Sequence, residues 1–480
     1  MALRAQQPSA NKRPAAIGRR GPISVRCYAR TPLKTGRGMT SIPTTLQTPS
    51  AAARTDAAPT DAARTLRLRA WRWHFLSAVL VVPFVLWQSL TGTMYLWSQA
   101  WIDAQHAELR FVAPGPVATS VDAQLQAARD AMPGQRIAGV LLPAEPARST
   151  QVTFADSGGL PAAVFVDPYR GRVLGVLHNA DWLPGWSRML HGGWPLGDAG
   201  SWLLELGACW TIIMVLTGLY LWWPRDARTP WQVLLPRINA GRRVFWRDLH
   251  ACVAVWFSLA IVLFLLTALP WTSLWGTQVL GRVQRALDQE GPPATGFAPV
   301  FAGKSDTSQS ASLDAMVQQA RGAGVEGDLM LYMVDGPPGS AVSVRSLRAR
   351  ASTERYVLFD RVDGAVLATA TWDDFPLLAK GVATGVDLHE GSFFGRAGPW
   401  VNTVFAAALV WLVVTGIAAW WRRRPARSVG IPPRPIGRWP AWLTACAIVM
   451  GLLLPLFGAS LLVLWLAERS WRLFSFGAQR

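Results

Sequence analysis

Four of the six histidines occur at matching places in two halves of the chain. His74 (in W-R-W-H-F) and His250 (in R-D-L-H-A) each open a long apolar run. His191 (in M-L-H-G-G-W) and His389 (in D-L-H-E-G-S) each shortly precede one. Neutral imidazole is the commonest protein ligand for metals, and a histidine inside or at the rim of a bilayer is costly and usually functional. The pattern predicts that these four side chains ligate metal.

The two halves align without a gap at a constant offset of 198. Leu190–Arg225 laid over Leu388–Arg423 gives 14 identical residues in 36, including the run H-x-G-x-x-x-G-x-x-G-x-W. Shared membrane composition alone does not readily produce such an ungapped run. The alignment predicts an internal two-fold repeat.

The elements that position these histidines are apolar helices. Hydrophobic residues make up 51% of the chain, which holds 26 tryptophans. About 20 apolar residues cross a bilayer core of ~30 Å. We expect a membrane all-α helical bundle with four core spans and a fifth that Pro455 and Gly458 would kink or make re-entrant. The expected spans are 71–99, 200–223, 247–275, 397–421 and 440–467.

The net charge of +18 does not indicate a nucleic-acid partner, because of where the charge lies. Basic residues gather in the N-terminal arm and in two short loops, 224–246 and 422–439. Short basic loops mark the cytoplasmic side of a membrane. We therefore expect a cytoplasmic N-terminus, with the large segments 100–190 and 276–388 outside. The tail, 468–480, opposes this orientation weakly.

The first 65 residues and the four cysteines carry less information. Residues 1–55 hold ten Lys or Arg and no acid, so they cannot bury a core. A disordered arm, an early start before Met39 and a transit-like segment all remain open. The chain has no C-x-x-C pair and no C-x-x-C-H. Thiol metal sites and covalent c-type haem are thereby excluded.

Both outer segments show one helical stretch followed by four short strand-like stretches. The first has its helix at 121–132, and P-Y-R-G at 168–171 fits a turn between paired strands. The second has its helix at 312–320 and a V-D-G turn at 362–364. The expected strands are 136–142, 150–154, 163–167 and 172–177 in the first segment, and 329–334, 341–347, 355–360 and 365–369 in the second. We expect two small extracytoplasmic α+β modules.

These motifs together resemble a known family. Modules ending F-V-D-P-Y-R-G-R-V-L-G, L-H-G-G before a span, T-G-L-Y-L-W-W-P-R at its end and R-x-L-H at 247–250 are similar to PepSY domains with PepSY-associated transmembrane helices. The family includes bacterial inner-membrane ferric-siderophore reductases and iron-regulated membrane proteins. In the reductase branch, the resemblance implies a bacterial inner-membrane protein whose four helical histidines bind two b-type haems. The long basic arm and the loosely matched second module depart from the family.

Topology predicts which histidines share a metal. His74 and His250 both start outward-going spans, so both lie near the cytoplasmic face. His191 and His389 both precede inward-going spans, so both lie near the outer face. Within one half the two are about a membrane thickness apart, which forces pairing across the halves. Axial imidazoles hold b-type haem non-covalently, so we expect two bis-His haems built between facing helices.

The remaining charged and polar candidates have secondary roles. Arg72, Arg188 and Arg247 each precede a proposed ligand by two or three residues, where they could pair with haem propionates. Positive-inside placement explains Arg72 and Arg247 equally well. His106 and His178 are expected on the surface or in loops. The G-A-G-V-E-G at 322–327 follows a helix, so a dinucleotide site is not expected there.

The expected function is electron transfer from the cytoplasmic side to an outer acceptor. No flavin or nicotinamide motif is present, so a separate cytoplasmic reductase or quinol would donate the electrons. A ferric chelate, such as a ferri-siderophore, is the expected acceptor, which would make the chain a reductase. Two alternatives stay open. One is a redox relay to a partner protein or copper, and the other is a non-redox scaffold whose modules bind a peptide or regulator.

Overall fold

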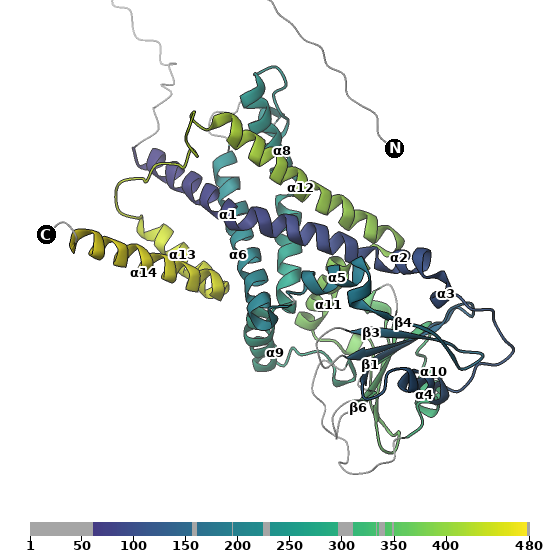
Figure 1. Ribbon diagram of the computed structural model, residues 1–480. Coiled ribbons are helices and arrows are strands. Elements are labelled where there is room, and N and C mark those ends of the chain that lie inside the picture. The colour runs from purple at the N-terminus through teal and green to yellow at the C-terminus, as the bar shows by residue number, and fades with distance from the viewer. Residues whose placement is uncertain are drawn as a thin grey trace, which may run out of the picture. The chain divides into compact units, whose positions relative to one another are not determined.

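The computed structural model describes residues 61–155, 161–193, 195–223, 231–295, 311–332, 334–335, 341–347 and 350–477 (Figure 1). Most of the expected N-terminal arm, up to residue 60, lies outside the described residues, and so does the start of the 224–246 loop.

Within the described residues, four helices are long and apolar enough to cross a membrane. Because a helix satisfies its own backbone hydrogen bonds, long apolar segments adopt it in lipid. These four confirm the four expected core spans, with ends that differ by a few residues. The first begins ten residues before the expected span, and the third ends early because Pro270 interrupts it. They are α1 (Asp61–Leu96), α6 (Gly197–Trp222), α8 (Arg242–Ala268, extended by η2, Leu269–Trp271) and α12 (Gly398–Arg423).

The expected fifth span is not one continuous helix. It is divided into α13 (Ala441–Leu453) and α14 (Pro455–Gly477), with Leu454 between them. Pro455 has no N–H and its ring clashes with the preceding turn. A Cβ on Gly451 would lie only 3.0 Å from the Cα of Gly458, so the chain folds tightly at the break. The break falls at Pro455, one of the two residues that the sequence indicates would kink the fifth apolar segment or make it re-entrant.

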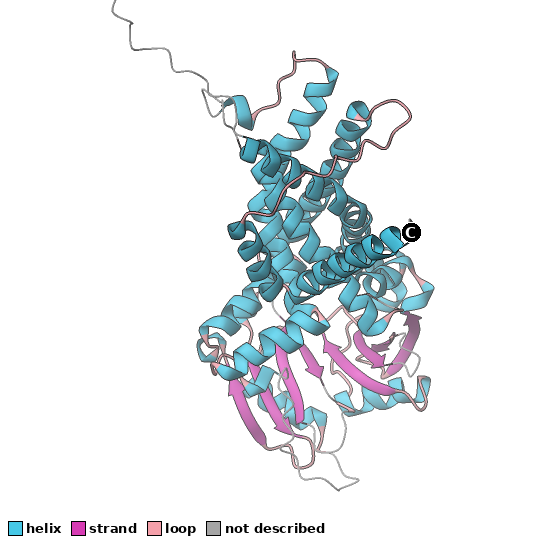
Figure 2. Ribbon diagram, turned by 90° about the vertical axis from the view of Figure 1, so that its left-hand side faces the viewer, coloured by secondary structure: helices cyan, strands magenta, loops and turns pink. Residues whose placement is uncertain are grey.

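The eight strands in the described part of the chain belong to one antiparallel sheet (Figure 2), in the order β4-β3-β2-β1-β5-β6-β7-β8. The expected strands are each present with small shifts at their ends. The inner strands of the two segments pair directly, with Val140 opposite Leu331. The strands are β1 (Arg136–Leu142), β2 (Thr150–Ala155), β3 (Ala162–Asp167), β4 (Arg172–His178), β5 (Asp328–Tyr332), β6 (Ala341–Leu347), β7 (Tyr356–Asp360) and β8 (Val366–Ala370).

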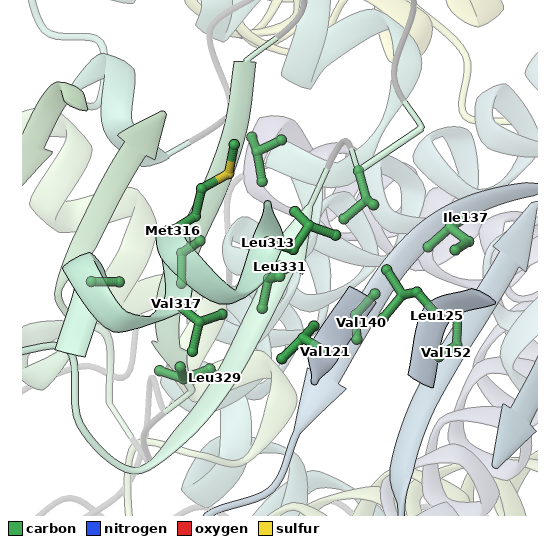
Figure 3. Close-up of a cluster of buried hydrophobic side chains, with 14 of the residues drawn as sticks. Val121, Leu125, Ile137, Val140, Val152, Leu313, Met316, Val317, Leu329 and Leu331 are labelled. Atoms are coloured by element: carbon green, nitrogen blue, oxygen red, sulfur yellow. The ribbon is translucent and has the colours of Figure 1, made fainter. Parts of the chain in front are cut away.

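The two helix-and-strand segments also share one hydrophobic core. Helices α4 (Val121–Ala131) and α10 (Leu313–Gly322) cover the same sheet, and their apolar side chains meet above it (Figure 3). Their N-termini cap each other: Asp314 accepts from the Val121 N–H (2.8 Å), and Asp122 accepts from the Ser312 hydroxyl (2.6 Å). The expectation of two separate modules is therefore wrong, because each segment completes the core of the other.

Short helices connect the sheet to the long ones. Ile102 and Leu109 pack with Phe165 and Leu177 of the sheet. The π-helix η3 (Ser273–Leu280) follows the third span, where the sequence gives no signal for it. The remaining helices are α2 (Ser98–Gln105), α3 (Ala107–Arg110), α5 (Leu183–His191), α7 (Trp231–Leu234), α9 (Gly281–Ala286) and α11 (Leu377–Glu390), with single turns η1 (Asn179–Asp181), η4 (Pro293–Thr295), η5 (Ala351–Thr353), η6 (Trp372–Asp374) and η7 (Gly395–Ala397).

Candidate cofactor sites: two histidine pairs

The four repeated histidines lie in two pairs, each joining the two halves of the chain. The ring centroids of His74 on α1 and His250 on α8 are 6.4 Å apart. Those of His191 on α5 and His389 on α11 are 6.3 Å apart. These are the pairs that the topology argument predicts.

The two pairs lie at different levels along α1 and α8, which carry the first pair and contact the second. Thr91, which contacts His191, follows His74 by seventeen residues on α1. Thr267, which contacts His389, follows His250 by seventeen residues on the α8 side. At 1.5 Å per residue, seventeen residues of helix correspond to about 25 Å. The pairs are thus separated by most of the thickness of a bilayer core.

Backbone carbonyl groups orient the His74–His250 pair. The Nδ1 of His74 lies 3.0 Å from the Met214 carbonyl oxygen on α6, and the Nδ1 of His250 lies 3.1 Å from that of Leu412 on α12. A carbonyl only accepts, so Nδ1 carries the proton in each ring. This tautomer leaves Nε2 with a free lone pair.

Threonine hydroxyls play the same part at the His191–His389 pair. Thr91 Oγ1 lies 3.1 Å from His191 Nδ1, and Thr267 Oγ1 lies 3.3 Å from His389 Nδ1. Both hydroxyls already donate to backbone carbonyls one turn or less back, at 2.7 Å. Each hydroxyl oxygen therefore accepts from Nδ1–H, and Nε2 is again left free. The tautomers follow from the hydrogen-bond network.

The spacing of each pair fits one metal between two imidazoles. A metal–imidazole nitrogen bond of about 2.0–2.1 Å, with the size of the ring added, places two trans centroids ~6.3 Å apart. A partner on the far ring nitrogen is the arrangement that orients ligating histidines. The described residues include no group of three or more His, Cys, Asp or Glu that could hold a metal. Each pair thus presents two imidazole Nε2 atoms that could ligate one metal ion between them.

Glycines allow the imidazoles to lie close against the helices. A Cβ at Gly92 would stand 2.9 Å from His191 Cε1. At Gly218 it would stand 3.1 Å from His74 Cε1, and at Gly416 it would stand 3.2 Å from His250 Cε1. A side chain at any of these positions would push the ring out of place.

One neighbour differs between the two rings of the His191–His389 pair. The ring of Phe264 stacks on His389 with centroids 4.4 Å apart. Gln88 lies at the corresponding place on α1, where its Nε2 reaches the His191 carbonyl at 3.5 Å and its buried Oε1 has no hydrogen-bond partner. The two rings therefore meet surroundings of different polarity.

The three arginines suggested by the sequence have other partners in the structure. Arg72 donates to the Pro432 carbonyl. Arg247 forms an ion pair with Asp248, which Arg237 also contacts. The guanidinium of Arg188 lies 5.8 Å from the Tyr95 ring. Their role towards propionates stays a prediction.

The remaining two histidines belong to neither pair. His106 stands between α2 and α3, 3.6 Å from a Glu108 carboxylate oxygen, and His178 ends β4.

The partners of the imidazoles could not be named from the sequence. One signal for them exists in the sequence. Thr91 lies seventeen residues after His74, and Thr267 lies seventeen residues after His250. The carbonyls of Met214 and Leu412 leave no signal, because every residue has one.

Comparison with known proteins agrees with the residue pattern. No curated protein matches the chain. The family described as PepSY-associated TM region matches residues 71–423, which is most of the chain and contains all four histidines. With four helices among the described residues that are long and apolar enough to cross a membrane, this multi-pass membrane protein belongs to the PepSY-associated transmembrane family.

Proposed function

We propose that the chain is a transmembrane dihaem b-type cytochrome, with His74 and His250 as axial ligands of one haem and His191 and His389 as those of the other. The observation that carries this proposal is the geometry of the pairs. Both have the centroid separation of trans imidazoles on one metal, and all four Nδ1 atoms are engaged so that Nε2 is free.

A bound haem supplies reversible one-electron chemistry, while the protein supplies position and potential. Here the carbonyls and threonines hold the rings, and the glycines let them approach the helices. The His74–His250 pair lies among four long apolar helices, since α1 and α8 carry the two rings and α6 and α12 supply the carbonyls beside them. Arg72, Arg188 and Arg247 precede proposed ligands by two or three residues in the sequence and are candidates to form ion pairs with the haem propionates.

We also infer that the two halves are an internal repeat. The aligned residues, the equal His-to-Thr spacing and the equivalent carbonyls of Met214 and Leu412, 198 positions apart, support it. The positive-inside rule places the His74–His250 pair near the cytoplasmic face of a bacterial inner membrane, and the sheet in the periplasm.

In this orientation the protein carries electrons from a cytoplasmic reductase or quinol to a periplasmic acceptor. A ferric chelate such as a ferri-siderophore is the proposed acceptor, because the family contains such reductases and the His191–His389 pair lies on helices that border the sheet. Ferrous iron binds these chelators weakly, so one-electron reduction releases it. The second candidate, a relay to a partner protein or copper, shares the same haem geometry.

Reoxidation of the reduced protein tests the acceptor. Purified protein reduced with dithionite is mixed with a ferric siderophore, and ferrous iron is trapped with ferrozine. The proposal expects loss of the reduced spectrum together with ferrous-complex formation, and His389→Ala should abolish both. If a panel of ferric chelates leaves the spectrum unchanged while a periplasmic protein or copper reoxidises it, the relay replaces the reductase. If the purified protein contained no haem, the non-redox scaffold would be the remaining candidate function.

A further inference from the structure

A row of polar side chains runs along one face of α6 and meets the start of the π-helix η3. Asp198 accepts from the Ser273 hydroxyl at 3.1 Å. Ser201 accepts from the Ser273 N–H at 2.9 Å. Glu205 accepts through Oε2 from the Trp275 N–H at 2.9 Å. Positions separated by three and four residues lie on one face of a helix, so the three groups form a continuous polar strip.

The strip runs from the surface into the protein. Asp198 is exposed, Ser201 is half-buried and Glu205 is fully buried, with 0% of its surface accessible. Seven residues of helix cover about 10 Å. An exposed acid and a half-buried hydroxyl thus lie on the same face of this long apolar helix as the buried acid.

Glu205 is poorly compensated where it lies. Its Oε1 is buried without a hydrogen-bond partner, and within the described part of the chain Trp275 N–H is the only group that bonds its side chain. No ion pair reaches it among these residues. A buried carboxylate needs a counter-charge and several donors, and ionisable residues at membrane depth usually mark a proton or ion pathway.

The equivalent positions in the other half of the chain do not form such a strip. At the same offset of 198 the positions hold Arg396, Pro399 and Thr403. Thr403 accepts from the Trp97 indole at 2.9 Å and donates to the Pro399 carbonyl, so that place carries an ordinary neutral contact. The packing of a spanning helix at this position therefore does not require an acid.

Irregular structure surrounds Glu205. Trp275 belongs to the π-helix, and its indole donates to the Leu453 carbonyl at the break between α13 and α14. Such π-helical turns are rare in proteins overall, and those that occur are often found at functional sites. The acid thus stands where a π-helix and a broken helix meet a regular span.

We propose that Glu205 is a proton-binding site inside the membrane, and that Asp198 and Ser201 form the path by which the proton arrives from water. The proton leaves a water-borne donor and forms an O–H bond on the unpartnered oxygen of Glu205, which turns the carboxylate into a neutral acid. Release runs in reverse, and no electron moves. A divalent metal ion is not the ligand, because it would need about six oxygen ligands, and the described residues include no group of three or more His, Cys, Asp or Glu that could supply them. The site stands independently of the haem proposal.

Infrared spectroscopy of the full-length protein in lipid nanodiscs tests the site at neutral pH. The wild type should show a protonated-carboxyl stretch that Glu205→Gln removes, because glutamine keeps the acceptor for Trp275 N–H but cannot titrate. Glu108→Gln is the matched control, since it removes an exposed acid that lies outside the polar strip, and it should keep the band. Glu205→Asp should keep the band with a shifted frequency, which covers the case in which the glutamine variant does not fold.

The path is tested by the rate at which that band shifts after transfer to heavy water. Asp198→Asn and Ser201→Ala should each slow the shift severalfold, with unchanged circular dichroism. A wild-type spectrum without any band that depends on Glu205 would overturn the proton site. A band whose exchange rate is the same in all three proteins would overturn the path.

Discussion

The two histidine pairs hold their rings at nearly the same separation but by different means. The His74–His250 pair sits on two long helices and is fixed by backbone carbonyls. The His191–His389 pair sits on two short helices, α5 and α11, and is fixed by threonine side chains. The position of the first pair of rings therefore follows from how the spans pack. The position of the second pair depends on particular side chains and on the sheet beside it.

The largest expected effect is loss of one haem by one substitution. His74→Ala and His250→Ala should each remove the same haem, and His191→Ala and His389→Ala should each remove the other, because one imidazole cannot hold the site alone. Each variant should retain about one haem per chain in a pyridine haemochrome assay. If His74→Ala and His191→Ala remove the same haem, the pairing across halves is refuted.

Removing a threonine hydroxyl should affect the His191–His389 pair alone. Thr91→Val and Thr267→Val leave Nδ1–H without its acceptor, and loss of such a partner typically weakens metal affinity by about 10–100-fold. Haem retention during dilution, followed by absorbance, measures this.

Thr217→Val is the matched control for the other pair. Its Oγ1 lies 3.4 Å from His74 Nδ1, but the Met214 carbonyl remains at 3.0 Å. Haem retention in this variant should stay close to that of the wild type. Equal losses at both pairs would show that the two are not fixed by different means.

Adding a methyl group beside each ring should disturb the pairs to graded extents. Gly92→Ala places a Cβ 2.9 Å from His191, and Gly416→Ala places one 3.2 Å from His250. The shorter approach requires the larger shift of the ring, so Gly92→Ala should alter the low-spin electron paramagnetic resonance signal of its haem more than Gly416→Ala alters the other. The reverse order would contradict these contacts.

The smallest expected effect concerns the link from α11 to the sheet. Asp387, two residues before His389, accepts from the Ala351 N–H at 2.9 Å in η5, between β6 and β7. Asp387→Ala removes a hydrogen bond to a charged group, worth about 1.5–3 kcal/mol. Thermal release should begin earlier for the His191–His389 haem only, and a simultaneous shift of both haems would argue against a separate anchor.

The features that the sequence predicts are those that leave a pattern within a short stretch of chain. The four spans follow from apolar length, and the strands on either side of P-Y-R-G follow from alternation and turn residues. The histidines stand out because they recur at fixed places in two halves. All of these signals lie within short stretches of chain.

Contacts between distant residues are what the sequence does not show. The pairing of β1 with β5, which turns two expected modules into one sheet, joins positions nearly 200 residues apart. The Met214 and Leu412 carbonyls are invisible in a pattern of side chains. Glu205 gives no signal in the sequence, because the role of one acid in an apolar run cannot be inferred until its burial is known.

The haem content of the purified protein tests most directly whether the two histidine pairs each bind a haem. A visible spectrum with a pyridine haemochrome count on protein from haem-replete cells should show low-spin b-type haem at two per chain. A colourless preparation would contradict the account and leave the two histidine pairs without their proposed metal.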